Sequence, residues 1–190
     1  MQRIRTRQWL LAFTCAVVVV AAPPAVWQAS AEIPEPSLDI AVRYVLETVR
    51  AFRSAYVLKV VEHLREGGIQ TKEQWTADAH ALPLPAQFVK EAGGLIDSFE
   101  IGLMGIAPLS PTNVPRTSAE ADALQRLSKD GTQRMITFLD GDQMKGLSAD
   151  VALVQSCVDC HNAHPKAKWH QFKKGDVLGA IVVRINRKRS

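Results

Sequence analysis

Cysteine is scarce in this chain of 190 residues, which contains three. Cys15 falls within an apolar N-terminal stretch that has the features of a removable segment, so the remaining chain keeps Cys157 and Cys160. Two cysteines separated by two residues close too small a loop to hold distant parts of a fold together. A disulfide framework is therefore excluded, and we expect this pair to serve chemistry.

An excess of charge is also lacking. The formal net charge is +4, but three of the 23 basic residues are Arg3, Arg5 and Arg7. Without this N-terminal cluster, 20 basic residues stand against 19 acidic ones, which is a net charge of +1. Nucleic acid is therefore not an expected partner. We expect the basic C-terminal residues to form a solvated tail (Arg184, Arg187, Lys188 and Arg189).

A long apolar run occurs at the N-terminus. Positively charged residues 1–7 precede the apolar stretch 9–22, and Ala29-Ser30-Ala31 supplies small residues suited to cleavage. The sequence predicts a signal peptide over residues 1–31 and a periplasmic or otherwise exported protein. The alternative is an uncleaved membrane anchor, because the apolar stretch extends to about Trp27. Pro23 and Pro24 count against a continuous spanning helix.

Helical periodicity dominates the first half of the remaining chain. Residues 32–37 contain Pro34 and Pro36 and predict a linker, and a domain is expected over residues 38–186 before the tail 187–190. Apolar residues in steps of three and four predict one long helix that ends at Gly67-Gly68 (Leu38, Val42, Val45, Val49, Phe52, Tyr56, Val60 and then His63). Two shorter helices are expected over 86–92 and 119–129, the latter capped by Thr117-Ser118.

Strand patterns follow these helices. The sequence predicts a strand within 95–109, a hairpin of 133–139 and 143–154 with its turn at 140–142, and a last strand over 177–185. Internal repeats and low-complexity segments are absent. Helices first and strands later favour an α+β fold with an antiparallel sheet.

The chemical centre of the sequence is Cys157-Val158-Asp159-Cys160-His161. This C-x-x-C-H spacing is typical of covalent attachment of a c-type haem, in which two thiols bind the porphyrin and the histidine ligates its iron. One alternative is a zinc site completed by His164 and His170. Another is a redox dithiol, but the βαβ setting of such a motif is missing. Since c-type haem is assembled outside the cytoplasm, export agrees with the haem interpretation.

The sixth iron ligand is open at this point. We expect His80, or secondly His63, while the other histidines and three methionines also offer lone pairs (His164, His170, Met104, Met135 and Met144). Haem propionates would suit Asn113, Arg116 or the lysines around Trp169.

Several stretches occur together in an order that resembles one family, the PAS-like single-haem c-type domain, a family of unknown function. They are Ala81–Phe88, Pro108–Asn113, Glu120–Leu124, Cys157–His161 and Lys174–Gly179. The resemblance spans roughly residues 37–185 and implies a PAS-like antiparallel sheet, a long N-terminal helix and one covalent haem. Such domains occur as free exported proteins and as sensor domains ahead of histidine kinases. Some members carry a cysteine between the first two helices, which this chain lacks, so thiolate ligation is not transferred.

Two functions from different classes follow. The first is an exported monohaem c-type cytochrome that acts in electron transfer or redox sensing, with an unidentified redox or signalling partner. The second is a gas-sensing haem module that signals through a partner, because no output domain follows Ser190. An enzyme such as a peroxidase would need a distal acid–base group that the sequence does not specifically supply. The long helix makes a homodimer an open alternative to a monomer.

Overall fold

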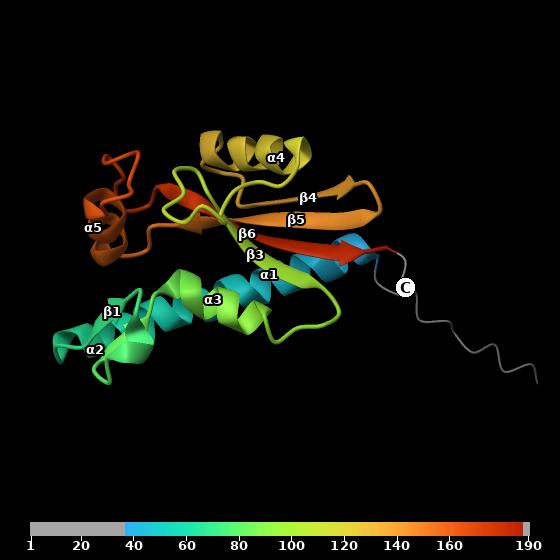
Figure 1. Ribbon diagram of the computed structural model, residues 1–190. Helices are drawn as coiled ribbons and strands as arrows, with labels where there is room; N and C mark the ends of the chain where they lie inside the picture. The colour runs from blue at the N-terminus through green and yellow to red at the C-terminus, as the bar shows by residue number, and fades with distance from the viewer. Residues whose placement is uncertain (1–36, 188–190) are drawn as a thin grey trace, which may run out of the picture. The chain divides into compact units, whose positions relative to one another are not determined.

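The structure, a computed structural model, describes residues 37–187 (Figure 1). The predicted signal segment, most of the linker and residues 188–190 of the predicted tail lie outside this range. The helices are α1 (Leu38–Ala55), η1 (Tyr56–Val61), α2 (Glu62–Glu66), η2 (Trp75–Ala77), α3 (Pro85–Gly93), α4 (Ser118–Lys129) and α5 (Gln155–Ala163). The strands are β1 (Gln70–Lys72), β2 (Ala81–Pro83), β3 (Glu100–Gly105), β4 (Met135–Asp140), β5 (Gln143–Val151) and β6 (Val177–Asn186). None of these described helices is long and apolar enough to cross a membrane.

A four-stranded sheet forms the centre of the domain. Its strand order is β3-β6-β5-β4, and every neighbouring pair is antiparallel. Strands β4 and β5 form the predicted hairpin, in which Gly141 adopts a φ of 59° between Asp140 and Gln143. The predicted α+β fold with an antiparallel sheet and a long N-terminal helix is confirmed.

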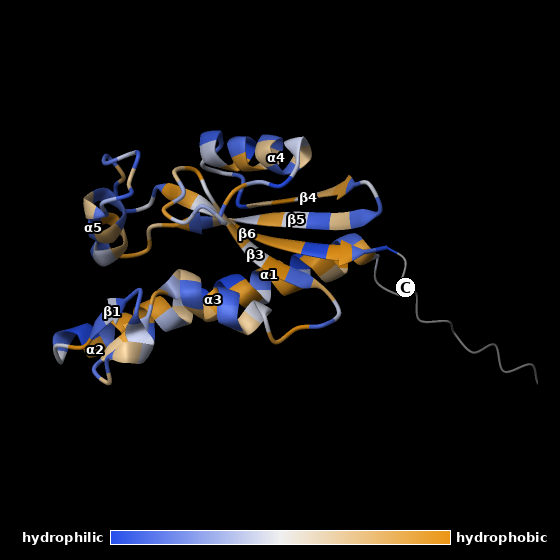
Figure 2. Ribbon diagram, in the orientation of Figure 1, coloured by the Kyte–Doolittle hydropathy of each residue, from blue (hydrophilic) through white to orange (hydrophobic). Residues whose placement is uncertain are grey.

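The sheet buries both of its faces. On one face, Ile181 and Val183 of β6 pack with Val42 and Leu46 of α1. On the other face, the alternate residue Val182 packs with α4. Figure 1 shows α4 on one side of the sheet and α1 with α3 on the other, and Figure 2 shows apolar residues along β6, as expected for a strand covered on both sides.

The long first helix is continuous from α1 through η1 to α2. It ends as predicted at Gly67, and Gly68 adopts a φ of 87°, a conformation that favours glycine. The backbone N–H groups of Gly68 and Ile69 then donate to the carbonyl groups of Arg65 and Leu64. These bonds satisfy carbonyl groups that the last helical turn leaves open.

Gly146 of β5 allows the long helix to lie close to the sheet. A Cβ atom at this position would come within 2.5 Å of a methyl carbon of Val42 and 2.7 Å of one of Leu46. Both side chains are fully buried. The position of α1 on the sheet therefore depends on the absence of a side chain at residue 146.

The apolar series that predicts the long helix is buried or half-buried up to Val49 and partly exposed beyond it. Phe52 is 67 % exposed and Val60 is 37 % exposed, whereas Arg53, Val57 and Val61 are buried. In this half of the helix the buried face is not the most apolar one, because Arg53, and not the neighbouring Phe52, points towards the interior.

A buried polar network lies between α4 and the sheet. The fully buried Glu120 accepts hydrogen bonds from Lys145 Nζ (2.9 Å) and from Arg184 Nε (2.7 Å) and Nη2 (3.0 Å). The prediction that Arg184 belongs to a solvated tail is therefore wrong, since its side chain is buried by pairing with Glu120. Burial alone would raise the pKa of Glu120, but the bonds from Arg184, the Arg116 backbone and Lys145 lower it to about 2.

The remaining predicted helices are confirmed with small shifts in their bounds. Helix α3 begins at Pro85, and α4 begins after the predicted cap, where Thr117 Oγ1 accepts from the backbone N–H of Glu120. Residues 70–83, for which the sequence predicts no helix or strand, contain the short parallel pair β1–β2. Strands of three residues are too short to leave a periodic pattern.

Replacing Glu120 by glutamine is expected to lower the free energy of unfolding by about 3 kcal/mol, because Lys145 and Arg184 would lose the buried charge that compensates them. Urea denaturation at neutral pH measures this change. A loss below about 1 kcal/mol would contradict a central role for the network.

The same variant provides a pH test. Since folding lowers the pKa of Glu120 from 4.5 to about 2, its ionised carboxylate stabilises the fold fully above the unfolded pKa, and this contribution is lost as the pH falls through the folded value. The stability difference between wild type and E120Q should therefore shrink on acidification below about pH 4. Glu47→Gln, on an exposed position of α1, is the control and should change stability by less than about 0.5 kcal/mol.

Candidate functional site

Helix α5 presents the two cysteines and the following histidine on one face. Cys160 and His161 follow Cys157 by three and four positions, a spacing that places both on the same side of a helix as Cys157. This helix is not among those expected from the sequence. The signal that predicts one is the series Val154, Cys157, Val158 and His161, which repeats in steps of three, one and three.

Apolar contacts and side-chain hydrogen bonds hold α5 in place. Val158 packs in a buried cluster with Ala152, Phe172 and Leu178. Asn162 binds the backbone of Phe172 twice, since its Nδ2 donates to the carbonyl (2.9 Å) and its Oδ1 accepts from the N–H (3.0 Å). These contacts tie the loop after α5 to the helix and so fix the face that carries the cysteines.

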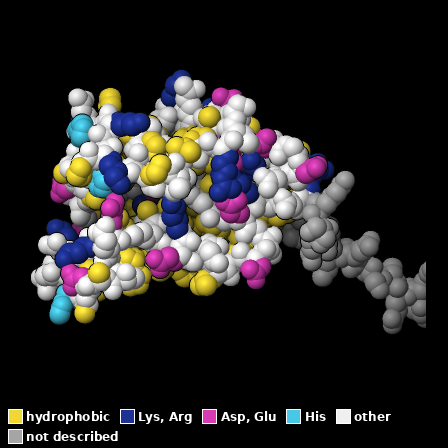
Figure 3. All heavy atoms as spheres, viewed as in Figure 1, with side chains coloured by type: hydrophobic (Ala, Val, Ile, Leu, Met, Phe, Trp, Pro, Cys, Tyr) yellow, Lys and Arg dark blue, Asp and Glu magenta, His cyan; other side chains and the backbone are white. Residues whose placement is uncertain are grey.

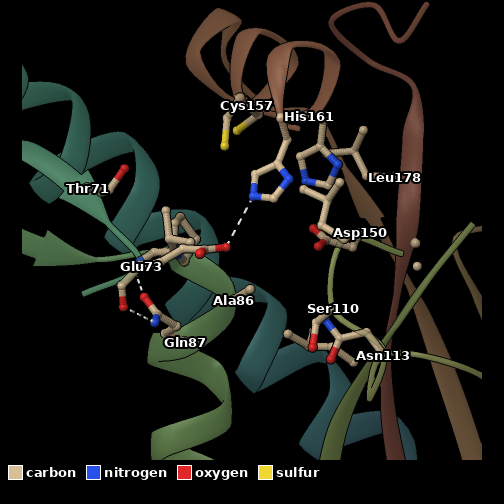
Figure 4. A pocket seen from close by; sticks show the side chains of 18 of the residues that line it. Thr71, Glu73, Ala86, Gln87, Ser110, Asn113, Asp150, Cys157, His161 and Leu178 are labelled. Carbon is tan, nitrogen blue, oxygen red and sulfur yellow. Dashed lines mark hydrogen bonds and ion pairs between the residues drawn. The ribbon is translucent and has the colours of Figure 1, made fainter. Parts of the chain in front are cut away.

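Cys157, Cys160 and His161 line a cavity of about 760 Å³. Figure 4 shows Cys157 and His161 directed from α5 into this space, with Glu73, Ala86 and Gln87 across from them. Ser110 and Asn113 in the loop after β3 form a further wall. Segments from the whole length of the described domain therefore meet around the cysteine motif.

The long helix contributes another wall through residues spaced by four. Arg53, Val57, Val61 and Arg65 all line the cavity. In an α-helix, a step of four residues rotates about 40° past a full turn, so this series would drift around the helix. The π-helical turn η1 contains more residues per turn and offsets part of that drift. It thereby keeps one face of the helix on the cavity.

The imidazole of His161 is prepared to act as a ligand. Burial, with contributions from the positive charge of Arg53 and from His164, lowers its pKa below 6.5. The ring is therefore neutral at physiological pH, the form that binds metals. Its Nδ1 atom is buried without a hydrogen-bond partner among the described residues. The ring of Phe172 packs edge-on against it at a centroid distance of 5.9 Å.

The thiol of Cys160 is not activated as a thiolate. Its pKa is raised by partial desolvation of the sulfur and by the neighbouring Cys157 and Glu73, although the residue as a whole has exposed surface. Both cysteines are unbridged. A redox dithiol uses a lowered thiol pKa, so this environment gives the dithiol interpretation no support.

A buried ion pair lies beside the histidine. Arg53 Nη1 contacts Asp150 Oδ1 at 2.8 Å, and both residues line the cavity. Burial raises the pKa of Asp150, and the charge of Arg53 opposes this shift. Sequence reasoning missed both residues, because an arginine on a helix and an aspartate in a strand pattern are usually solvated.

The structure brings neither predicted sixth ligand to the cavity. His80 is exposed in a turn, where its backbone N–H donates to Asp78 Oδ1 (2.9 Å), and His63 is exposed on α2. Neither residue lines the cavity. Histidine side chains are accordingly visible at the surface of the end of the molecule that carries α2 and α5 (Figure 3).

His164 does reach the cavity, three residues after His161. Its side chain is 16 % exposed, and its Nε2 lies 3.2 Å from Oε1 of Glu73, which also lines the cavity. His170 is instead exposed, with its Nδ1 2.6 Å from the carbonyl oxygen of Asn162. Within residues 37–187 no group of three histidine, cysteine, aspartate or glutamate side chains is arranged to hold a metal, so the zinc alternative has no support there.

Of the residues suggested as propionate contacts, one lines the cavity and the others do not. Asn113 lines the cavity, and within the described part of the chain its buried Oδ1 has no hydrogen-bond partner. Arg116 pairs with Glu100 (2.6 Å) outside the cavity. None of the lysines around Trp169 lines it (Lys166, Lys168, Lys173 and Lys174).

A family model described as Tll0287-like matches residues 34–186, which is most of the chain. The chain belongs to the Tll0287-like family. This assignment confirms the family resemblance that the combined motifs indicated. Among solved structures, this Tll0287-like chain is similar to the crystal structure of the cyanobacterial heme-protein Tll0287, with a TM-score of 0.56 and 16 % sequence identity. The match covers 82 % of this chain and 98 % of that chain. No curated protein matches the chain in sequence.

Asn162→Ala should lower the free energy of unfolding by about 1–2 kcal/mol, because two part-buried backbone groups of Phe172 would lose their partners. Urea denaturation measures the loss, and faster hydrogen exchange of the Phe172 amide would locate it. The matched control is Gln155→Ala on the same helix, which removes an exposed bond to Asp159. Equal effects of the two substitutions would contradict a specific role for Asn162.

Proposed function

We propose that this chain is an exported haem protein. Cys157 and Cys160 attach one haem covalently, His161 ligates its iron, and the protein transfers electrons or senses redox state with a partner protein. The observation that carries the proposal is the convergence of these three side chains on one cavity. The similarity of the fold to that of a cyanobacterial heme-protein adds support.

The residues around the cavity fit a haem. Its volume of about 760 Å³ lies within the range of about 300–1,000 Å³ that cofactor sites occupy. Val57, Val61 and Leu178 supply apolar surface for a porphyrin, and His161 is neutral. Arg65 and Lys90 also line the cavity and supply positive charge that suits the carboxylate end of a haem.

The attachment requires two thiols and no oxidant. Each cysteine adds across one vinyl group: its sulfur bonds to one vinyl carbon, and the thiol hydrogen ends on the other. The spacing of three residues on one helical turn lets both sulfurs reach a single porphyrin. A bound haem supplies one-electron chemistry, while the chain holds the ring, orients His161 and limits the access of water.

Covalent attachment is testable by mass spectrometry of the denatured protein. After expression with a cytochrome maturation system, the exported chain should begin near Glu32 and carry the mass of one haem. The C157A/C160A variant should lose covalent haem completely, because no thiol remains for attachment. Gln155→Ala on the same helix is the control and should keep it. A wild-type chain without covalent haem would refute the proposal.

A second candidate function is binding of a diatomic gas at the iron. One observation favours it: the expected sixth ligands His80 and His63 do not line the cavity, although His164 and Met104, which also offer lone pairs, do.

Absorption spectra of the ferrous protein with and without carbon monoxide or nitric oxide test this alternative. With an open sixth position, both gases should shift the Soret band, and H80A and H63A should have the wild-type spectrum. H161A should lose the spectrum of a histidine-ligated iron. A ferrous protein that ignores both gases would exclude gas binding, and a change to high spin in H80A or H63A alone would restore that histidine as the ligand.

A further inference from the structure

A second, smaller pocket of about 230 Å³ lies beside the cavity, on the α1–β5 side of the domain. Arg50, Arg53 and Ser54 of α1 line it together with Arg134, Asp150 and the strand residues around them. Arg53 and Asp150 also line the large cavity, so their ion pair separates the two spaces.

The charge of this pocket is unbalanced. Three arginines line it against a single aspartate. Arg50 and Arg134 are exposed, and no ion pair joins either of them to a carboxylate within the described residues. Converging guanidinium groups raise each other's electrostatic energy unless an anion lies between them.

Arg53 supplies an independent indication of a ligand. It is 7 % exposed, and it donates to Asp150 through Nη1. Its Nε–H is buried, and among residues 37–187 this atom has no hydrogen-bond partner. A buried donor without a partner costs about 1–3 kcal/mol, so a bound acceptor at this position would recover that energy.

We propose that the pocket formed by Arg50, Arg53, Ser54 and Arg134 binds a small oxyanion. Guanidinium groups match the oxygens of phosphate, sulfate and carboxylate groups through paired hydrogen bonds. The volume is below that of sites for drug-sized ligands, so it suits a single oxyanion group. The Ser54 hydroxyl adds a neutral donor on the same wall.

The shared ion pair gives the site a regulatory consequence, which rests on the proposed haem function. An anion beside Arg53 offsets the positive field that this residue exerts in the large cavity. Negative charge near an iron favours the ferric state, so a bound anion should lower the reduction potential of the haem.

The test uses isothermal titration calorimetry of the full exported protein with inorganic phosphate at constant ionic strength. Wild type should bind one phosphate saturably, and R50Q/R134Q should weaken binding at least tenfold. Both substitutions are on exposed side chains, so the fold should be kept, and circular dichroism checks it. The control R126Q/K129Q removes the same charge from exposed positions of α4, on the opposite face of the sheet, and should bind like wild type.

Other results overturn the proposal or identify the source of the anion. Equal loss in both double variants, or unchanged binding in R50Q/R134Q, would refute the site. Sedimentation with vesicles containing phosphatidylglycerol is the second arm. Binding of vesicles alone, abolished in R50Q/R134Q, would assign the anion to a lipid head group, whereas binding to neither phosphate nor vesicles would refute the proposal.

Calorimetry requires no haem, so this test is independent of the proposed function. In protein that carries haem, potentiometric titration should give a lower midpoint potential with phosphate for wild type and R126Q/K129Q, and no phosphate effect for R50Q/R134Q. If phosphate leaves the midpoint potential of wild type unchanged, the proposed coupling between the anion and the haem is refuted, but the anion site itself is not.

Discussion

Close packing of the long helix on the central sheet determines where both cavities lie. Gly146 lets Val42 and Leu46 contact β5 at a distance that a side chain would prevent. From this contact the helix continues along the large cavity and presents Arg53 to Asp150, which belongs to the same strand as Gly146. The sheet contact and the buried ion pair are therefore two points on one helix–strand interface, and a shift at the first would alter the second.

The polar groups of this domain divide into two sets with different surroundings. Glu120 has two buried cationic partners and a full set of hydrogen bonds, so its charge contributes to the fold. Arg53 has one described partner and keeps a free buried donor at the cavities. Natural proteins satisfy nearly all buried polar groups, so the free donor of Arg53 calls for a partner, for which the proposed anion is a candidate.

Sequence alone predicted the features that depend on neighbouring residues. The Gly67-Gly68 helix end, the Thr117 cap, the 140–142 turn and the cysteine–histidine motif are all set by residues a few positions apart. It did not predict Arg53 beside Asp150, because these residues meet through the packing of a helix on a strand far along the chain. For the same reason the sequence could not show that His80 and His63 lie outside the cavity, because their positions relative to α5 follow from tertiary packing.

The π-helical turn η1 has a consequence for how this helix tolerates changes of length. A single π-helical turn takes up one extra residue without further net rotation, so a one-residue deletion within it would restore an ordinary α-helix and leave the flanking turns in phase. Arg65 would then stay on the cavity wall, whereas a one-residue deletion between Leu46 and Arg53 would rotate Arg53 by about 100° away from Asp150. Deletions in α1 before Val42 would disturb neither the sheet contact of Val42 and Leu46 nor the position of Arg65 on the cavity wall. Homologous sequences should therefore tolerate a change of one residue within this turn and keep a fixed number of residues between Leu46 and Arg53.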